Sequence, residues 1–195
     1  MLPPLCFITP DNIKQNTIEI LLKAGIQWIQ CRSKSISRKE FYYASLKIRE
    51  LTKAFNALLI VNDYPDLAIA IDADGVHLGQ DDLPLKEARK IMGSKIIGIS
   101  THSIEEAVKA EKEGADYIGF GAIFPTLTKK DAAVRGVEML RKVCESVKIP
   151  VIAIGGINIS NARQAFEAGC SAIAVSSGLL KEPIEANTKN FLDII

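Results

Sequence analysis

The chain has 195 residues, a hydrophobic content of 48% and a net charge of +1 from 24 basic and 23 acidic residues. This length suits one domain with a sizeable core, and we expect a single domain over residues 1–195. Because positive and negative charges are scattered and nearly balanced, the basic stripe of a nucleic-acid-binding protein is absent, and nucleic acid is not expected as a partner.

Hydropathy and cysteine spacing bear on two further classes, membrane proteins and proteins that bind zinc or iron–sulfur clusters. No apolar stretch approaches the ~20 residues of a membrane helix, and no signal peptide is recognisable, so we expect a cytoplasmic protein with no membrane partner. The cysteines form no Cys-x-x-Cys pair, and the chain has only two histidines, so neither zinc nor an iron–sulfur cluster is predicted. We expect Cys6, Cys31, Cys144 and Cys170 to be reduced and mostly buried.

One pattern recurs along the chain: a helical segment ends near a small residue, and a short apolar run follows. It occurs at Gly25, Gly75, Gly114 and Gly169. Glycine just beyond a helix adopts the left-handed conformation at little cost. Short apolar runs that alternate with helices indicate parallel strands in βα units.

The apolar runs predict eight strands in chain order. Their ranges are 5–9, 28–32, 58–62, 75–78, 96–100, 117–121, 151–154 and 172–176. Helices are predicted over 12–23, 37–55, 64–71, 85–92, 103–113, 136–147 and 160–168, with a last one from about residue 184. Eight strands alternating with eight helices predict a (β/α)8 TIM barrel, an α/β fold, near the compact limit of its size range.

The helix expected at 103–113 carries a start signal. Ser103 and Glu106 have the spacing of a capping box, in which the serine hydroxyl accepts from the third helical amide and the glutamate reaches back to the serine amide. We expect this box to form.

In such a barrel the active site lies at the carboxyl ends of the strands. The residues after the predicted strands are strongly polar, whereas the opposite ends carry Gly, Ala and Pro. The polar set comprises Arg32, Lys34, Asn62, Asp63, Gln80, Asp82, Ser100, His102, Thr126, Thr128, Lys129, Lys130, Ser176 and Ser177. This asymmetry predicts chemistry at one end of the barrel.

Two of these residues, Asp63 and Asp82, follow neighbouring strands and could face one site. Mg²⁺ prefers one or two carboxylates together with substrate phosphates, so the pair is a candidate magnesium site. The alternative is that each aspartate only forms a turn or caps a helix.

Glycines and serines after the last two strands suggest a phosphate site. Gly155 and Gly156, and the run from Ser176 through Ser177 to Gly178, stand where barrels often bind phosphate with backbone amides. The alternative is that they only make tight turns.

A second anion site is indicated by three cations, Arg32, Lys34 and Lys129, although each could be a solvated surface charge. Because side chains alternate along a strand, Gln30 and Arg32 should lie together, with Cys31 against the outer layer. No base stands near Cys31 in the sequence, so we do not expect it to be a nucleophile.

The polar loop over 125–131 has the length of a movable lid, with an ordinary solvated loop as the alternative. Neither histidine is assigned a catalytic role. His77 is expected to be a hydrogen-bonded core residue, and His102 to help a helix begin.

Long motifs cover nearly the whole chain. In order they are Gln30-Cys-Arg-Ser-Lys34, Val61-Asn-Asp63, Gly75-Val-His-Leu-Gly-Gln-Asp-Asp82, Gly98-Ile-Ser-Thr-His-Ser103, Gly114-Ala-Asp-Tyr-Ile-Gly-Phe-Gly121, Phe124-Pro-Thr-Leu-Thr-Lys-Lys-Asp131 and Ile154-Gly-Gly-Ile157. Together they resemble the thiamine phosphate synthase and thiazole tautomerase superfamily.

The resemblance implies an enzyme that joins hydroxymethylpyrimidine diphosphate to the phosphate ester of hydroxyethylthiazole and releases pyrophosphate. It implies a dissociative reaction, in which pyrophosphate leaves before the thiazole nitrogen attacks. Asp63 and Asp82 would hold Mg²⁺, and Ser100 would lie near the pyrimidine. Gln30, Arg32, Lys34, Asn62 and Lys129 would surround the pyrophosphate. Thr126, Thr128, Gly156, Ser176 and Ser177 would hold the thiazole phosphate.

Some positions depart from the family pattern. Ser33 stands where an acidic residue is usual, Cys31 where an apolar or small polar residue is usual, and Ala122 where Pro is common. In the related thiazole tautomerases, the catalytic histidine occupies the position of Ala122. A tautomerase, and a paralogue that binds thiazole phosphate or thiamine phosphate without catalysis, remain alternatives. The C-terminal helix looks short, which leaves a homodimer open.

Overall fold

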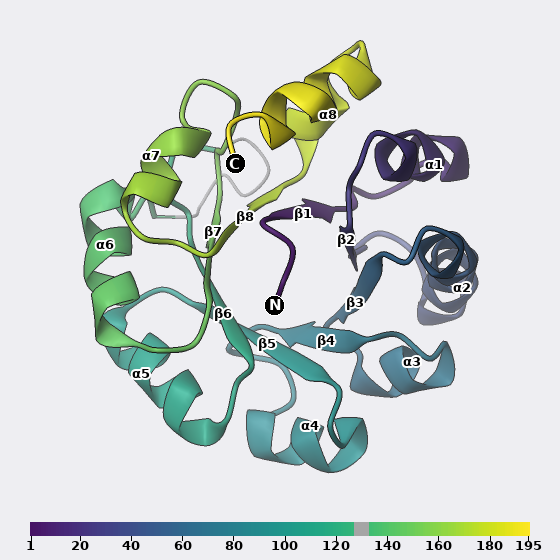
Figure 1. Cartoon of the computed structure of the whole chain (residues 1–195). Coiled ribbons are helices and arrows are strands. Elements are labelled where there is room, and N and C mark those ends of the chain that lie inside the picture. The colour runs from purple at the N-terminus through teal and green to yellow at the C-terminus, as the bar shows by residue number, and fades with distance from the viewer. Residues whose placement is uncertain (127–132) are drawn as a thin grey trace.

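Parallel strands pair in chain order and close into a barrel in this computed structural model, which describes residues 1–126 and 133–195 (Figure 1). The described strands are β1 (Leu5–Ile8), β2 (Trp28–Cys31), β3 (Leu58–Asn62), β4 (Gly75–Leu78), β5 (Ile96–Thr101), β6 (Tyr117–Gly121), β7 (Val151–Ile154) and β8 (Ala172–Val175). Strand β8 returns to pair with β1. The (β/α)8 barrel predicted from the sequence is therefore confirmed.

Helices surround this barrel and cover the outer faces of its strands (Figure 1). They are α1 (Gln15–Lys23), α2 (Arg38–Ala54), α3 (Pro65–Ala70), α4 (Leu85–Met92), α5 (Ile104–Glu113), α6 (Gly136–Ser146), α7 (Ala162–Glu167) and α8 (Ile184–Leu192), with a short 3-10 helix, η1 (Ser177–Leu180). Helix α1 begins later than predicted because Asn12 takes a left-handed φ of 60° and Lys14 is extended. Sequence reasoning did not find η1. No helix in the described ranges is long and apolar enough to cross a membrane.

The capping box predicted at the start of α5 forms only in part. Ser103 accepts from the Glu106 amide at 3.2 Å, as expected. The Glu106 carboxylate, however, accepts from the amide of His102 at 2.7 Å, one residue further back than predicted. A complete box, which the sequence analysis overlooked, starts α2: Ser37 and Glu40 satisfy each other's amides there.

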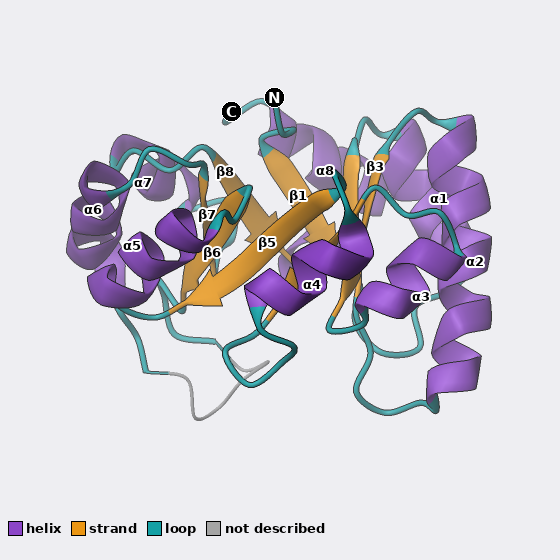
Figure 2. Ribbon diagram, turned by 90° about the horizontal axis from the view of Figure 1, so that it is seen from below, coloured by secondary structure: helices purple, strands orange, loops and turns teal. Residues whose placement is uncertain are grey.

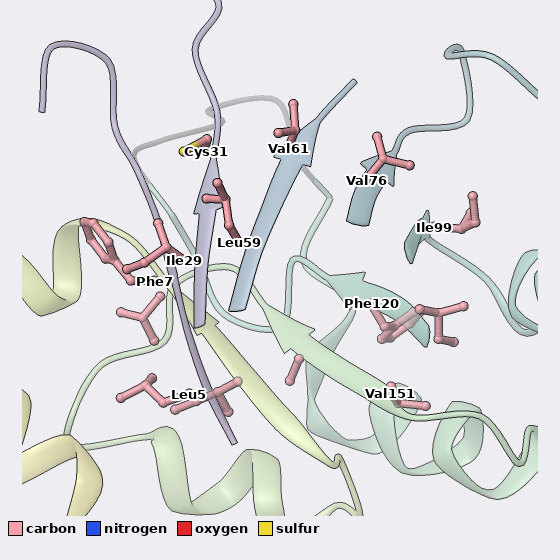
Figure 3. Packing of buried hydrophobic residues seen from close by; sticks show 14 of the residues in the cluster. Leu5, Phe7, Ile29, Cys31, Leu59, Val61, Val76, Ile99, Phe120 and Val151 are labelled. Atoms are coloured by element: carbon pink, nitrogen blue, oxygen red, sulfur yellow. The ribbon is translucent and has the colours of Figure 1, made fainter. Parts of the chain in front are cut away.

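Side-chain alternation divides the buried residues into two clusters. Outward-facing residues of the strands pack against the helices, and Figure 3 labels several residues of this cluster, among them Leu59 and Val61 of β3. Inward-facing residues fill the barrel, where Trp28 of β2 meets Tyr117 of β6 edge-on with ring centroids 5.4 Å apart. Both rings are almost fully buried, so side chains fill the barrel at this level and leave no channel through it.

The face that carries the amino ends of the strands lies on the same side as the two chain termini (Figure 2). This face contains a hollow of about 610 Å³ that Asp74 and Asp116 help to line. Each carboxylate is already bound: Asp74 accepts from Arg49 at 2.9 Å, and Asp116 accepts from Arg89 at 2.7 Å. Each also accepts from the backbone of a neighbouring strand, so these acids hold strand ends together. The sequence analysis described this end as Gly, Ala and Pro and missed their role.

Room for the Tyr117 ring depends on Gly98 of β5, since a methyl group at Gly98 would lie 2.1 Å from the ring carbon Cζ. We predict that Gly98→Ala lowers the free energy of unfolding in urea by about 1–3 kcal/mol, as overpacked cores do. Gly114→Asn is the control for a glycine substitution without steric overlap, because nothing lies within 4 Å of that position; its left-handed φ of 92° strains any side chain, and Asn is among the residues that bear this best. Equal stability of Gly98→Ala and the wild type would mean that the ring does not pack there.

Candidate active site

The carboxyl ends of the strands lie on the face opposite the chain termini, as the direction of β5 in Figure 2 shows. Inward-facing polar residues lie here, above the aromatic floor of the barrel. Gln30 of β2 donates to the Asn62 side chain of β3 at 2.7 Å, and the Asn62 amide donates in turn to the Asp63 carboxylate. The structure thus brings together three residues that the sequence predicts for the pyrophosphate and metal end of the site.

Asp63 has an unusual backbone conformation directly after β3. Its φ of 67° is left-handed, and its amide donates to the His77 carbonyl of β4 at 2.9 Å. Such conformations cost energy in a residue other than glycine and concentrate at functional sites. The neighbouring helix α3 has Tyr64 as its N-cap and Pro65 in its first turn, so Asp63 does not cap it.

Asp82 lies in the turn after β4, and its carboxylate accepts from the Gly79 amide at 2.6 Å. Asp82 therefore closes a turn, as the alternative interpretation held, and also approaches Asp63. Burial first, and then the negative charge of Asp82, raise the pKa of the Asp63 carboxyl above its usual value. Two carboxylates therefore approach each other in a partly buried site. Their repulsion costs free energy, and a bound cation would reduce that cost.

Asp63 and Asp82 fit a metal that takes its other ligands from elsewhere. Among residues 1–126 and 133–195, no group of three or more His, Cys, Asp or Glu side chains could hold a metal ion. Two carboxylates with space for phosphate oxygens and water match the usual surroundings of Mg²⁺.

The candidate cations Arg32 and Lys34 lie in the loop after β2. The Arg32 backbone is fixed to Thr9, which donates to its carbonyl at 3.1 Å and accepts from its amide at 2.9 Å. The Lys34 amide donates to Asp11 at 3.1 Å, and the Lys34 charge is close enough to favour the ionised form of Asp63. A hydrogen bond from the Ser33 hydroxyl is the largest effect that lowers the pKa of Asp11.

Across the barrel mouth, the turn after β7 lies against the loop after β6, where the Phe124 amide donates to the Gly155 carbonyl at 3.0 Å. Gly155 and Gly156 have φ values of 97° and 67°, and a methyl group at Gly156 would lie 2.4 Å from the Pro125 carbonyl oxygen. Only glycine fits there. Thr126 follows in the loop after β6 and is half-buried. Thr128, Lys129 and Lys130, with most of the predicted lid, lie outside the described residues.

The serines after β8 lead into η1. Ser176 is the N-cap of η1 without a side-chain capping bond, and Ser177 is exposed. Asn187 of α8 donates to the carbonyls of Gly178 and Leu179, both at 2.9 Å, and so ties the C-terminal helix to this turn. Nothing in the local sequence pattern marks Asn187, because its partners lie in another element.

Ser100 lies near the end of β5, where hydrogen bonds fix both its backbone carbonyl and its side-chain hydroxyl. The Gln80 side chain donates to its carbonyl at 2.5 Å, and its hydroxyl lies 2.9 Å from Nε2 of His77. His77 is a hydrogen-bonded interior residue, as predicted, and burial lowers its pKa to about 4. His102 contacts Glu106 at the start of α5, also as predicted.

Cys31 packs in the outer layer, as side-chain alternation predicted (Figure 3). Burial raises its pKa to about 12, so it stays a thiol at neutral pH. All four cysteines are free, and Cys144 alone is not fully buried. No cysteine is therefore a nucleophile candidate.

The closed barrel carries an acid pair on one side of its mouth and a turn of two glycines on the opposite side. This architecture is that of the TIM-barrel enzymes. The chain belongs to the thiamine monophosphate synthase family, whose model matches residues 5–179.

Named relatives agree with this assignment. A thiamine-phosphate synthase of Caldanaerobacter subterraneus subsp. tengcongensis is 49% identical over 177 residues, covering 90% of this chain and 83% of the relative. That of Pyrococcus furiosus is 47% identical over 194 residues, covering 98% of this chain and 94% of the relative. A solved thiamine phosphate pyrophosphorylase from Pyrococcus furiosus superposes with a TM-score of 0.92 at 43% identity, covering 98% and 94% of the two chains. The predicted thiamine phosphate synthase function, that of a transferase, is confirmed.

We predict that Asp63→Asn removes activity but raises the melting temperature by roughly 1–3 °C, the shift expected for up to about 1 kcal/mol in a chain of this length. Asn tolerates the left-handed φ and removes the repulsion from Asp82. Because the pKa of Asp63 is raised on folding, its unfavourable contribution grows as the pH rises above its unfolded value of about 3.9.

The stability difference between Asp63→Asn and the wild type should therefore widen between pH 4 and pH 7 in thermal denaturation experiments. A variant that is less stable than the wild type at pH 7 would contradict the repulsion. Asp81→Asn, an exposed aspartate next to Asp82 whose charge does not contribute to the raised pKa of Asp63, is the control for loss of an aspartate charge outside the pair.

Proposed function

We propose that this thiamine phosphate synthase depends on Mg²⁺ and uses the residues at the barrel mouth for two separate tasks. One side of the mouth would bind the diphosphate of 4-amino-2-methyl-5-hydroxymethylpyrimidine diphosphate. The other would bind the phosphate of 4-methyl-5-(2-phosphoethyl)thiazole or its carboxylate form. The observation that carries the proposal is the Asp63–Asp82 pair, whose mutual repulsion a divalent cation would relieve.

On the diphosphate side, Asp63 and Asp82 would hold the metal. Bound there, Mg²⁺ would neutralise negative charge on the departing pyrophosphate. Gln30 and Asn62 support this role, because their hydrogen-bonded chain ends on the Asp63 carboxylate and fixes its orientation. Arg32 and Lys34 would supply positive charge to the diphosphate oxygens, and Lys129 is proposed for the same task.

On the thiazole side, Thr126, Thr128, Gly156, Ser176 and Ser177 would bind the phosphate. Gly155 and Gly156 carry no side chains, and their left-handed φ values of 97° and 67° form a turn of the kind that presents backbone amides to an anion, which supports this role. Ser100 would lie beside the pyrimidine. Catalysis would then consist of charge neutralisation and alignment of two substrates, without a protein nucleophile.

The thiazole tautomerase alternative is less well supported. The position that carries a histidine in tautomerases is Ala122, a buried residue whose side chain offers no base. Its carbonyl accepts from the Arg135 amide at 2.7 Å, so only its backbone makes a polar contact there.

We predict that the purified chain forms thiamine phosphate and pyrophosphate from the two substrates only when a divalent metal is present. Chromatography of the products, with Mg²⁺, with Mn²⁺ and with excess chelator, measures this directly. Tight binding of both substrates without product in any metal would favour the non-catalytic paralogue. Rapid interconversion of thiazole tautomers, followed by NMR, would favour the tautomerase.

We predict that Ser176→Ala mainly raises KM for the thiazole phosphate, because that phosphate is held equally before and during the reaction. Steady-state kinetics with each substrate varied in turn separates KM from kcat. Ser171→Ala, an exposed serine before β8, is the matched control. A fall in kcat with unchanged KM would place Ser176 in the reacting region instead.

A further inference from the structure

A row of three hydrogen-bonded side chains leads from the barrel interior to Ser100 at the candidate site. His77 of β4 lies between Ser100 of β5 and Tyr117 of β6, three residues from neighbouring strands. Its Nε2 is 2.9 Å from the Ser100 hydroxyl, and its Nδ1 is 3.0 Å from the Tyr117 hydroxyl. His77 is 7% exposed and Tyr117 is 1% exposed, so the row runs from the barrel interior to the mouth.

The barrel interior is shaped around this row. A methyl group at Gly98 would overlap the Tyr117 ring, and one at Gly119 would lie 3.2 Å from Cε1 of His77. The cavity that these residues share has a volume of about 30 Å³, far too small for a substrate. Any ligand therefore lies above the row and meets it only through Ser100.

Among the described residues, both ring nitrogens of His77 face hydroxyl groups, and neither is hydrogen-bonded to a carboxylate. A charged imidazole or a phenolate buried without a partner of opposite charge would be costly, so both groups are neutral. The imidazole therefore carries one proton, on either Nδ1 or Nε2, and the phenol keeps its own.

The phenol determines which nitrogen carries the proton. Among the described residues, the Tyr117 hydroxyl has one hydrogen-bond partner, Nδ1 of His77. A buried hydroxyl that fails to donate is costly, so Tyr117 donates to Nδ1, which must then be unprotonated. The proton lies on Nε2, which donates to the Ser100 oxygen.

We propose that His77 is a positioning residue whose tautomer, fixed by Tyr117, makes Ser100 a hydrogen-bond donor toward the barrel mouth. With its oxygen accepting from His77, the Ser100 hydroxyl turns its own proton outward. The ligand feature that matches is an acceptor atom, such as a ring nitrogen of the pyrimidine. This inference rests on the proposed function, which puts the pyrimidine beside Ser100.

The tautomer can be read directly by NMR of the full chain with ¹⁵N-labelled histidine. There are two histidines, so His102→Gln identifies the His77 signals. We expect a protonated Nε2 and an unprotonated Nδ1 in the wild type. A protonated Nδ1 would overturn the proposal.

The consequence for binding can be measured by calorimetry with Mg²⁺ present, without turnover. Tyr117→Phe keeps the ring and removes only the hydroxyl, and Ser100→Ala removes the proposed donor. Each should weaken binding of the pyrimidine diphosphate about fivefold, the size expected for one neutral hydrogen bond. Neither should change binding of inorganic pyrophosphate, which has no ring. The double variant should bind no worse than Ser100→Ala alone, because both changes remove the same interaction.

Additive losses in the double variant, or equal losses for pyrophosphate, would mean that Tyr117 acts only by supporting the fold. Tyr43→Phe on the exposed side of α2 controls for loss of a hydroxyl elsewhere. A wild type that binds both ligands and has the predicted tautomer, but forms no thiamine phosphate, would contradict the proposed function alone.

Discussion

The packing of Trp28 against Tyr117 inside the closed barrel determines where the remaining polar groups can lie. These two rings, with the aliphatic residues around them, fill the interior and leave a cavity of about 30 Å³. Substrates that carry phosphate groups must therefore bind at the mouth, where the strand ends and their loops supply polar groups. The floor is rigid because it is closely packed, and rigid strand ends hold the residues above them in fixed positions.

At the barrel mouth, the conformation and surroundings of Asp63 lower the stability of the folded chain without ligand. Asp63 combines a left-handed backbone, partial burial and a neighbouring carboxylate, and each of these costs free energy in the folded chain without ligand. The chain of amides from Gln30 through Asn62 holds the carboxylate in place despite this cost. A site of this kind favours ligands that bring positive charge, which is the physical basis for expecting a metal together with the diphosphate.

The sequence predicted the features that depend on local pattern. Alternation gave the inward direction of Gln30 and the outward direction of Cys31, and each strand was found because its apolar run is short and bounded. Features that depend on side chains meeting across distant elements were missed. The Glu106 carboxylate accepts from the amide of His102 and not from that of Ser103. Asn187 donates to a carbonyl in the turn that precedes its own helix. His77 forms a hydrogen bond with Tyr117, which lies 40 residues further along the chain. No spacing rule within a single element reports such contacts.

We propose that Asp63 and Asp82 together hold the divalent metal that accompanies the diphosphate. A crystal structure of the chain grown with Mn²⁺ and inorganic pyrophosphate tests it most directly, because the anomalous signal of manganese locates the ion independently of the refined coordinates. We expect an anomalous peak at coordination distance from a carboxylate oxygen of each aspartate, about 2 Å for a hard cation of this size, with pyrophosphate oxygens completing the coordination. Pyrophosphate bound at the mouth with no anomalous peak between the two carboxylates would contradict it.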